Sequence, residues 1–129
     1  MSDLRRVLFV EDQPAIFAIL ELALRKVGGF ETYGFATGGD AVAQAALIRP
    51  QLFLLDVMMP DLDGPATLAL LRKVEGLADV PAVFLTAKVE QTQADRLLAL
   101  GAMAVLFKPF DPMTLAGQIQ DIWAGALSV

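Results

Sequence analysis

The stretch Gln51–Gly64, with the sequence QLFLLDVMMPDLDG, decides the fold. Its first part is an uninterrupted apolar run, which is typical of a strand buried on both faces of a parallel sheet. Its second part, rich in Pro, Asp and Gly, indicates a loop. Asp56 stands where the two parts meet. A carboxylate at the end of a buried strand costs free energy unless it lies at the mouth of the sheet with a partner, so Asp56 is the first candidate functional residue.

Apolar runs and helical periodicity alternate along the rest of the chain. The expected strands are 6–10, 32–35, 52–56, 82–86 and 104–107, and the expected helices are 14–27, 39–48, 64–74, 91–100 and 112–126. Five strand–helix units with buried strands predict an α/β fold, a doubly wound parallel sheet of five strands. We find no repeat or linker, so we expect residues 1–129 to form a single domain without an output domain.

Composition excludes several classes of function. The chain has 129 residues, of which 56% are hydrophobic, with a net charge of −5 and neither Cys nor His. Thiolate, imidazole and zinc–thiolate chemistry are therefore excluded from the chain itself. The negative charge argues against direct binding of nucleic acid. No apolar run approaches the ~20 residues of a membrane span, and no secretory leader is recognisable, so we expect a cytoplasmic protein with no membrane partner.

Charged and hydroxyl side chains follow the expected strands. Glu11 and Asp12 come directly after the first strand, Thr86 ends the fourth and Lys108 follows the fifth. The carboxyl ends of parallel strands share one edge, which is where open α/β sheets bind ligands, so these side chains should converge with Asp56. Three carboxylates forced together call for a hard divalent cation, or else one of them stays protonated.

In their order and spacing, these motifs resemble the receiver domain of two-component response regulators, the CheY-like family. The matching segments are VLFVED (7–12), LLDVMMPDLDG (54–64), VFLTA (83–87) and FKPF (107–110). Together they cover essentially the whole chain. The resemblance implies a flavodoxin-like (βα)5 fold with strand order 2-1-3-4-5.

The resemblance also implies a Mg²⁺-dependent phosphoryl-transfer site. Asp56 would be the phospho-acceptor, acting as a nucleophile that forms an acyl phosphate. Mg²⁺ would be held by Asp12, by Asp56, by the backbone carbonyl of Met58 and by Glu11, the last mostly through a water molecule.

Three further groups would contact the phosphoryl oxygens in such a site. They are the Lys108 ammonium, the Thr86 hydroxyl and the backbone amide of Ala87. The peptide bond between Lys108 and Pro109 is expected to be cis, as in relatives.

The implied role is a signalling switch rather than metabolic turnover. A sensor histidine kinase or a histidine phosphotransfer protein would supply the phosphoryl group, and autodephosphorylation would remove it. Movement of Thr86 would shift the face made by the fourth helix, fifth strand and fifth helix, and so control binding of a downstream effector protein. We expect a monomer or a weak homodimer.

The sequence departs from the family pattern in three ways. Val105 stands where relatives carry an aromatic ring that reports the switch, so we expect coupling through the backbone and the fourth helix. Met58 and Lys88 occupy positions that tune the lifetime of the phosphoryl group, and an apolar Met58 cannot orient an attacking water. Residues 103–105 lack the acidic side chains of the salt-bridged dimer found in the transcription-factor subgroup.

Simpler interpretations stay open for single residues. Asp56 alone is compatible with a turn or a helix cap, and Glu11–Asp12 with an N-cap pair for the helix beginning at Pro14. Thr86 is compatible with an ordinary strand residue. Asp61 and Asp63 are expected to be solvated turn residues, with Gly64 supplying a backbone conformation that other residues avoid.

Three other functions are alternatives for the whole chain. An aspartate-nucleophile phosphohydrolase would carry a second acid two positions after the nucleophile, where this chain has Met58. A flavodoxin-like cofactor module would need a Gly- and hydroxyl-rich loop after the first strand, where this chain has an acidic one. A degenerate receiver used only for binding would not need the acidic residues and Lys108 together.

Overall fold

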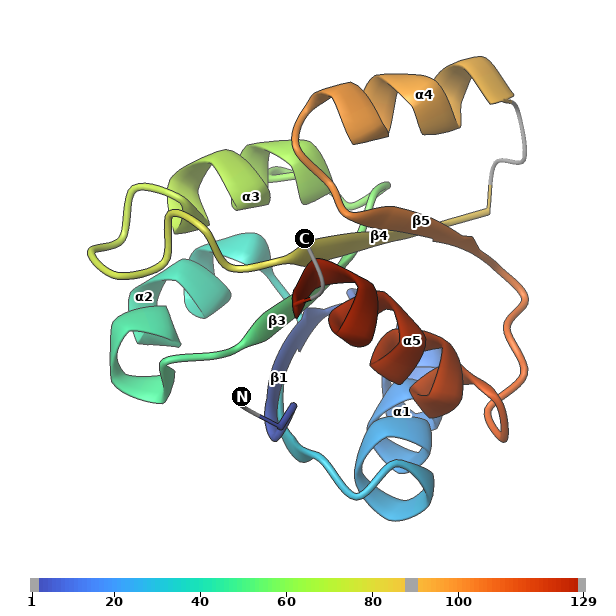
Figure 1. The fold of residues 1–129 in the computed structure, drawn as a ribbon. Helices are drawn as coiled ribbons and strands as arrows, with labels where there is room; N and C mark the ends of the chain where they lie inside the picture. The colour runs from blue at the N-terminus through green and yellow to red at the C-terminus, as the bar shows by residue number, and fades with distance from the viewer. Residues whose placement is uncertain (1–2, 88–90, 128–129) are drawn as a thin grey trace.

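A five-stranded parallel sheet forms the centre of the molecule, in the order β2-β1-β3-β4-β5. The computed structural model describes residues 3–87 and 91–127. The strands are β1 (Arg6–Val10), β2 (Glu31–Phe35), β3 (Leu52–Asp56), β4 (Ala82–Thr86) and β5 (Ala104–Phe107). The predicted fold class and strand order are confirmed, and Figure 1 shows β3 in the middle of the sheet between β1 and β4.

Helices follow the strands as predicted, with differences at their ends. They are α1 (Pro14–Glu21), the π-helix η1 (Leu22–Val27), α2 (Gly38–Ile48), α3 (Gly64–Leu71), α4 (Gln91–Ala99) and α5 (Leu115–Leu127). The first helix was expected to be a continuous α-helix, but its second half is π-helical. The last helix begins three residues later than expected, because the Asp111 carboxylate and carbonyl accept hydrogen bonds from the amides of residues 113–115 and make a turn there.

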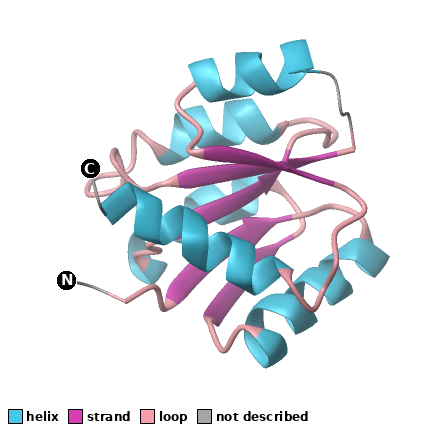
Figure 2. Cartoon of the chain, turned by 45° about the vertical axis from the view of Figure 1, so that its right-hand side comes forward, coloured by secondary structure: helices cyan, strands magenta, loops and turns pink. Residues whose placement is uncertain are grey.

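Two hydrophobic clusters cover the two faces of the sheet. One contains Leu20, Leu24, Leu115 and Ile119 of α1, η1 and α5, packed on alternate strand residues. The other packs side chains of α2, α3 and α4 on the remaining strand residues, which include the fully buried Phe53 and Phe84. Figure 2 shows the resulting three layers, helices on both sides of the twisted sheet. No helix within the described ranges is both long and apolar enough for a membrane span.

Candidate functional site

The acidic side chains of β1 and β3 meet at the carboxyl edge of the sheet. Val10 pairs with Leu55 in the parallel register, so Glu11 and Asp56, one residue further along, are neighbours. Backbone hydrogen bonds continue past the strand ends, from the Glu11 amide to the Phe35 carbonyl at 3.0 Å and from the Val57 amide to the Leu85 carbonyl at 3.1 Å. One carboxylate oxygen from each of Glu11, Asp12 and Asp56 lies within 4.8 Å of the other two. The predicted convergence of the three acids is confirmed.

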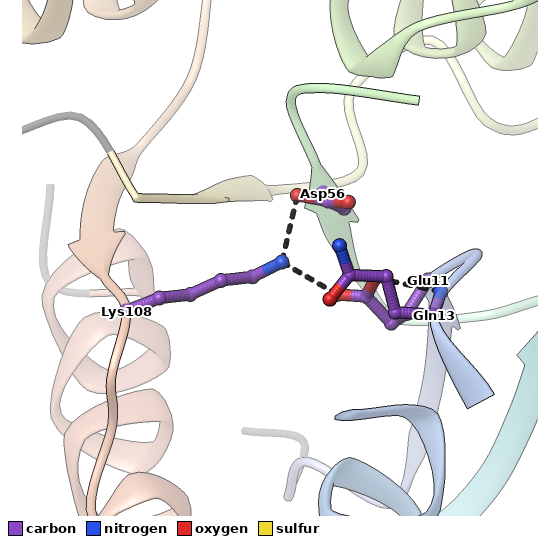
Figure 3. Close-up of polar contacts among 4 residues, drawn as sticks. All are labelled: Glu11, Gln13, Asp56 and Lys108. Atoms are coloured by element: carbon purple, nitrogen blue, oxygen red, sulfur yellow. Dashed lines mark hydrogen bonds and ion pairs between the residues drawn. The ribbon is translucent and has the colours of Figure 1, made fainter. Parts of the chain in front are cut away.

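Lys108 reaches this acidic group from the end of β5, as Figure 3 shows. Its Nζ lies 2.8 Å from Glu11 Oε1 and 3.1 Å from Asp56 Oδ1, and it donates a hydrogen bond to each. The side chains are 14% exposed for Lys108, 0% for Glu11 and 5% for Asp56. One ammonium therefore serves two buried carboxylates, which is the arrangement that keeps buried charges tolerable.

Burial and charge together shift two pKa values in the site. Burial raises the pKa of the Asp56 carboxyl to about 6; the hydrogen bond from Lys108 opposes this rise and the nearby Glu11 charge adds to it. Burial alone would lower the pKa of Lys108, but the hydrogen bonds to Glu11 and Asp56 outweigh it and raise that pKa above its ordinary value. Asp56 thus titrates close to neutral pH, while Lys108 stays protonated.

A buried carboxylate oxygen of Asp12 bears on whether the site fits a metal ion. Its Oδ1 is buried and has no hydrogen-bond partner within the described residues. Fully ionised, the three carboxylates and the one ammonium carry a formal charge of −2, which a divalent cation would neutralise. A set of carboxylate oxygens is the donor chemistry that Mg²⁺ prefers. The residues present therefore fit Mg²⁺.

The loop after β1 shows that neither acid caps the following helix. The N-cap of α1 is Gln13, and no side chain makes a capping hydrogen bond there. Glu11 Oε2 instead accepts a hydrogen bond from the Gln13 amide at 3.1 Å, which orients the carboxylate toward Lys108 (Figure 3). The N-cap interpretation of Glu11–Asp12 is wrong, and Gln13 is a residue of this site that sequence reasoning missed.

The loop after β3 is fixed by Gly64, for a different reason than expected. Its φ is not in the left-handed region; Asp61, with φ 65°, holds that conformation instead. A Cβ on Gly64 would overlap the backbone carbonyl oxygen of Asp56 and lie 3.0 Å from the Cα of Val57. Gly64 is needed because the chain returns so close to the nucleophile candidate.

Asp63 is the N-cap residue of α3, a role that its sequence context indicates. It is exposed, as expected, but its side chain also accepts a hydrogen bond from the Ala66 amide at 2.9 Å and so caps α3. An Asp directly before Gly64-Pro65 at a helix start is the usual N-cap signature, and this signal was available in the sequence.

Thr86 and Ala87 lie beside the acidic group, at the end of β4. Thr86 is only 1% exposed, and its carbonyl accepts the Lys108 amide at 2.8 Å, which ties the ends of β4 and β5 together. Ala87 borders the same cavity as Asp56 and Lys108. The Lys108–Pro109 peptide is cis, as predicted. Lys88 falls outside the described residues, and the Met58 carbonyl as a metal ligand stays a prediction.

Several cavities border the described residues of the site, and two of them are on opposite sides of the acidic group. One, of about 450 Å³, is bordered by Asp56 and Lys108 on one side and by apolar side chains that include Ile16, Ile19 and Phe110 on the other. The second, of about 550 Å³, lies on the Asp12 side, between the loops that follow β2 and β3. The acidic group is thus bordered by cavities on its Lys108 side and on its Asp12 side.

Comparisons with known proteins agree on one family. The profile described as "Response regulator receiver domain" matches residues 7–120. The chain is 38% identical over 120 residues to the probable transcriptional regulator ycf27 of Cyanophora paradoxa, and the aligned region covers 92% of this chain and 48% of that protein. It is 34% identical over 116 residues to the DNA-binding response regulator MtrA of Mycolicibacterium smegmatis, and the aligned region covers 90% of this chain and 49% of that protein.

The same agreement holds for solved structures. The chemotaxis protein CheY4 of Vibrio cholerae superimposes with a TM-score of 0.85 at 28% identity, covering 93% of this chain and 99% of that chain. By contrast, the chain spans about half the length of the curated relatives described above.

Proposed function

This chain belongs to the response regulator receiver domain family, and from that premise we propose that Asp56 accepts a phosphoryl group in a Mg²⁺-dependent reaction. The observation that carries the proposal is the convergence of Glu11, Asp12 and Asp56 within 4.8 Å, with Lys108 bonded to two of them. A receiver domain is a signalling domain rather than a metabolic enzyme. The residue roles below are proposals for this chain.

In the transfer step, one oxygen of the Asp56 carboxylate forms a bond to phosphorus. The P–N bond of the donor phosphohistidine breaks, and the leaving imidazole keeps the electron pair. Mg²⁺, when bound, would neutralise charge on the phosphoryl oxygens. Asp12, Asp56, the Met58 carbonyl and, through water, Glu11 would hold it.

The chain's own donors complete the stabilisation of charge. Lys108 exchanges its Asp56 contact for a phosphoryl oxygen, and the Thr86 hydroxyl and Ala87 amide donate to the other oxygens. Because the product no longer carries a free carboxylate at Asp56, the pairing of Lys108 differs between the two states. This difference is what biases the equilibrium between conformations of the domain.

The phosphoryl donor we propose is a sensor histidine kinase or a histidine phosphotransfer protein. The cavity of about 450 Å³ offers the surface, because Ile16 and Ile19 of α1 form an apolar wall beside Asp56. Ile19 is 42% exposed, so a partner can bury it without rearranging the core. A partner of this kind also places the reaction in the cytoplasm.

The output is binding of a downstream effector protein through the face made by α4, β5 and α5, and we propose a monomer or weak homodimer as its form. The relative MtrA is named as DNA-binding, and the match spans about half of it. The net charge of −5 supports the proposal that residues 1–129 do not themselves contact nucleic acid.

Intact mass spectrometry after incubation with acetyl phosphate tests the proposal. We expect one added phosphoryl group on the parent, dependent on Mg²⁺ and absent from Asp56→Asn. Asp61→Asn is the matched control, since it removes an exposed carboxylate five residues away and should leave the adduct intact. An adduct that persists in Asp56→Asn, or parent protein that neither gains mass nor binds beryllofluoride, would contradict the proposal.

A further inference from the structure

The cavity of about 450 Å³ beside Asp56 has an apolar wall made by two segments of the chain. Ile16 and Ile19 come from α1, and residues three positions apart lie on the same face of a helix. Phe110 comes from the loop between β5 and α5. Ile16 and Phe110 also pack on the cluster that contains α1 and α5, so this wall is anchored in the core.

The polar groups of this cavity are few. Among the described residues that border it, Asp56 and Lys108 are charged and Gln13 carries an amide, whereas the others are apolar. Lys108 Nζ lies 3.1 Å from Asp56 Oδ1, so the two charged groups stand together at one place in the wall. A cavity of this volume, mostly apolar with a few convergent polar groups, has the character of a site for a small molecule.

Two apolar side chains of this cavity are still exposed to solvent. Ile19 is 42% exposed and Met58 is 65% exposed. A hydrocarbon group that covers them removes apolar surface of both ligand and protein from water, and the unbranched Met58 side chain adapts to the shape of that group. The ligand that fits this cavity therefore has an anionic head for Lys108 and a short apolar tail.

The head group of such a ligand follows from the position of Asp56. Asp56 borders this cavity and is not among the described residues around the cavity on the Asp12 side. In phosphoryl transfer, the attacking and leaving oxygens lie roughly in line on opposite sides of phosphorus. A phosphodonor bound in this cavity therefore carries its leaving group away from Asp56, into space bordered by apolar side chains.

We propose that this cavity selects acyl phosphates with an apolar acyl chain longer than acetyl, as direct low-molecular-weight phosphodonors beside the protein donor proposed above. The inference rests on the proposed function, because it needs Asp56 as the acceptor. An oxygen of the Asp56 carboxylate bonds to phosphorus, the bond from phosphorus to the acyl oxygen breaks, and the carboxylate product leaves with the electron pair. One acyl phosphate is exchanged for another, so the step needs no further reactant and releases no proton.

A comparison of two donors tests this selection on the parent protein. Acetyl phosphate and butyryl phosphate release carboxylates of nearly equal basicity, so the ratio of their rate constants reports the contacts of the extra methylenes in butyryl phosphate. Because each buried methylene should raise the second-order rate constant about fourfold, butyryl phosphate should react roughly 4- to 16-fold faster than acetyl phosphate when Mg²⁺ is present. The reaction is followed as the adduct in intact mass together with the inorganic phosphate released.

Two substitutions three positions apart locate the effect on the cavity wall. Ile19→Asn places a polar amide in that wall and should reduce the ratio of butyryl to acetyl rate constants to below about 2. Leu22→Asn is the matched control, since Leu22 is 53% exposed and lies outside the group of residues that border the cavity. The ratio measured for Leu22→Asn should stay that of the parent.

The outcomes separate the two claims. A parent that reacts with butyryl phosphate no faster than with acetyl phosphate, or equal ratios in Ile19→Asn and Leu22→Asn, would overturn the selection of apolar donors and leave the proposed function standing. A parent that consumes neither donor faster than Asp56→Asn does would overturn the proposed function, and the selection of donors with it.

Discussion

Lys108 Nζ lies 2.8 Å from Glu11 Oε1, although the two residues are 97 positions apart in the chain. The contact joins the loop after β1 to the loop after β5, which are not neighbours in the sheet. Asp56 shares the same ammonium, so one side chain of the last strand compensates acids from the first and third strands. Any change at Lys108 therefore acts on stability as well as on chemistry.

Replacing Lys108 by Met should destabilise the protein without Mg²⁺. The substitution keeps the length of the side chain but leaves Glu11 and Asp56 without their common partner, and breaking a buried pair in this way costs roughly 3 kcal/mol. Urea unfolding measures the loss, and added Mg²⁺ should recover part of it. Lys73→Met, at an exposed position, is the control; equal effects of the two variants would contradict the expectation.

Stability should depend on pH through Asp56. Its pKa is about 6 in the folded protein against an ordinary 3.8, so the folded state binds the proton more tightly. The stabilisation is therefore complete below about pH 4 and is lost as the pH rises through about 6. Without Mg²⁺, the unfolding free energy of the parent relative to Asp56→Asn should fall by about 1 kcal/mol between about pH 5 and about pH 7.5.

The same pH series on Asp61→Asn provides the reference for this effect. Asp61 is exposed, so its replacement should leave the pH dependence of the parent unchanged. A flat difference between parent and Asp56→Asn would mean that Asp56 is not the group that titrates.

Removal of the Asp12 carboxylate should separate metal binding from stability. Without Mg²⁺, Asp12→Asn should be at least as stable as the parent, because it removes a charge whose Oδ1 has no partner in the described structure. With Mg²⁺ at about 100 times its dissociation constant, the parent should gain about 2.7 kcal/mol. The variant should need roughly tenfold more Mg²⁺ for the same gain in thermal unfolding, and an unchanged Mg²⁺ requirement would exclude Asp12 as a ligand.

Two glycines beside the site make a matched pair. Gly64→Ala should cost roughly 1–3 kcal/mol, because the added Cβ overlaps the Asp56 carbonyl and forces the loop to shift. Gly39→Ala, on α2, meets nothing within 4 Å and should be neutral or slightly stabilising. Chemical unfolding compares the two, and the acetyl phosphate reaction should be slowed only in Gly64→Ala.

The lifetime of the phosphoryl group should depend on Met58. Its side chain is 65% exposed and borders the cavity at Asp56, where an apolar group cannot orient an attacking water. Met58→Asn should therefore lose the phosphoryl group several-fold faster than the parent, as followed by intact mass over time. Met113→Asn, a 70% exposed methionine outside the cavity wall, is the control. Decay in the parent as fast as in Met58→Asn would contradict this.

The sequence predicted the strands better than the helices, for a physical reason. A buried strand ends where its apolar run ends, as at Asp56 and Thr86, and four of the five strands have the expected bounds. Helix ends depend on local hydrogen bonds that the periodicity does not encode. The turn at Asp111 and the π-helical stretch Leu22–Val27 are of this kind.

The sequence predicted those site residues that stand at or just after the ends of the parallel strands. Glu11, Asp12, Asp56 and Lys108 meet because parallel order brings their strand ends to one edge. The pairing of Lys108 with Glu11 was not expected, since it depends on side-chain reach across two intervening strands. The packing of Gly64 against the Asp56 backbone was also missed, because amino-acid composition does not show where two backbone segments approach each other closely.

The two hydrophobic clusters have a consequence for how this domain tolerates change. They share no buried residue and lie on opposite faces of the sheet, one holding α1 and α5 and the other holding α2, α3 and α4. Distant substitutions without common partners have additive effects on unfolding free energy. The wall at Ile16 and Ile19, where we propose that a phosphodonor binds, lies on the α1 side of the sheet. Substitutions there should leave the packing of α2, α3 and α4 unchanged, so donor specificity can change without altering that part of the core.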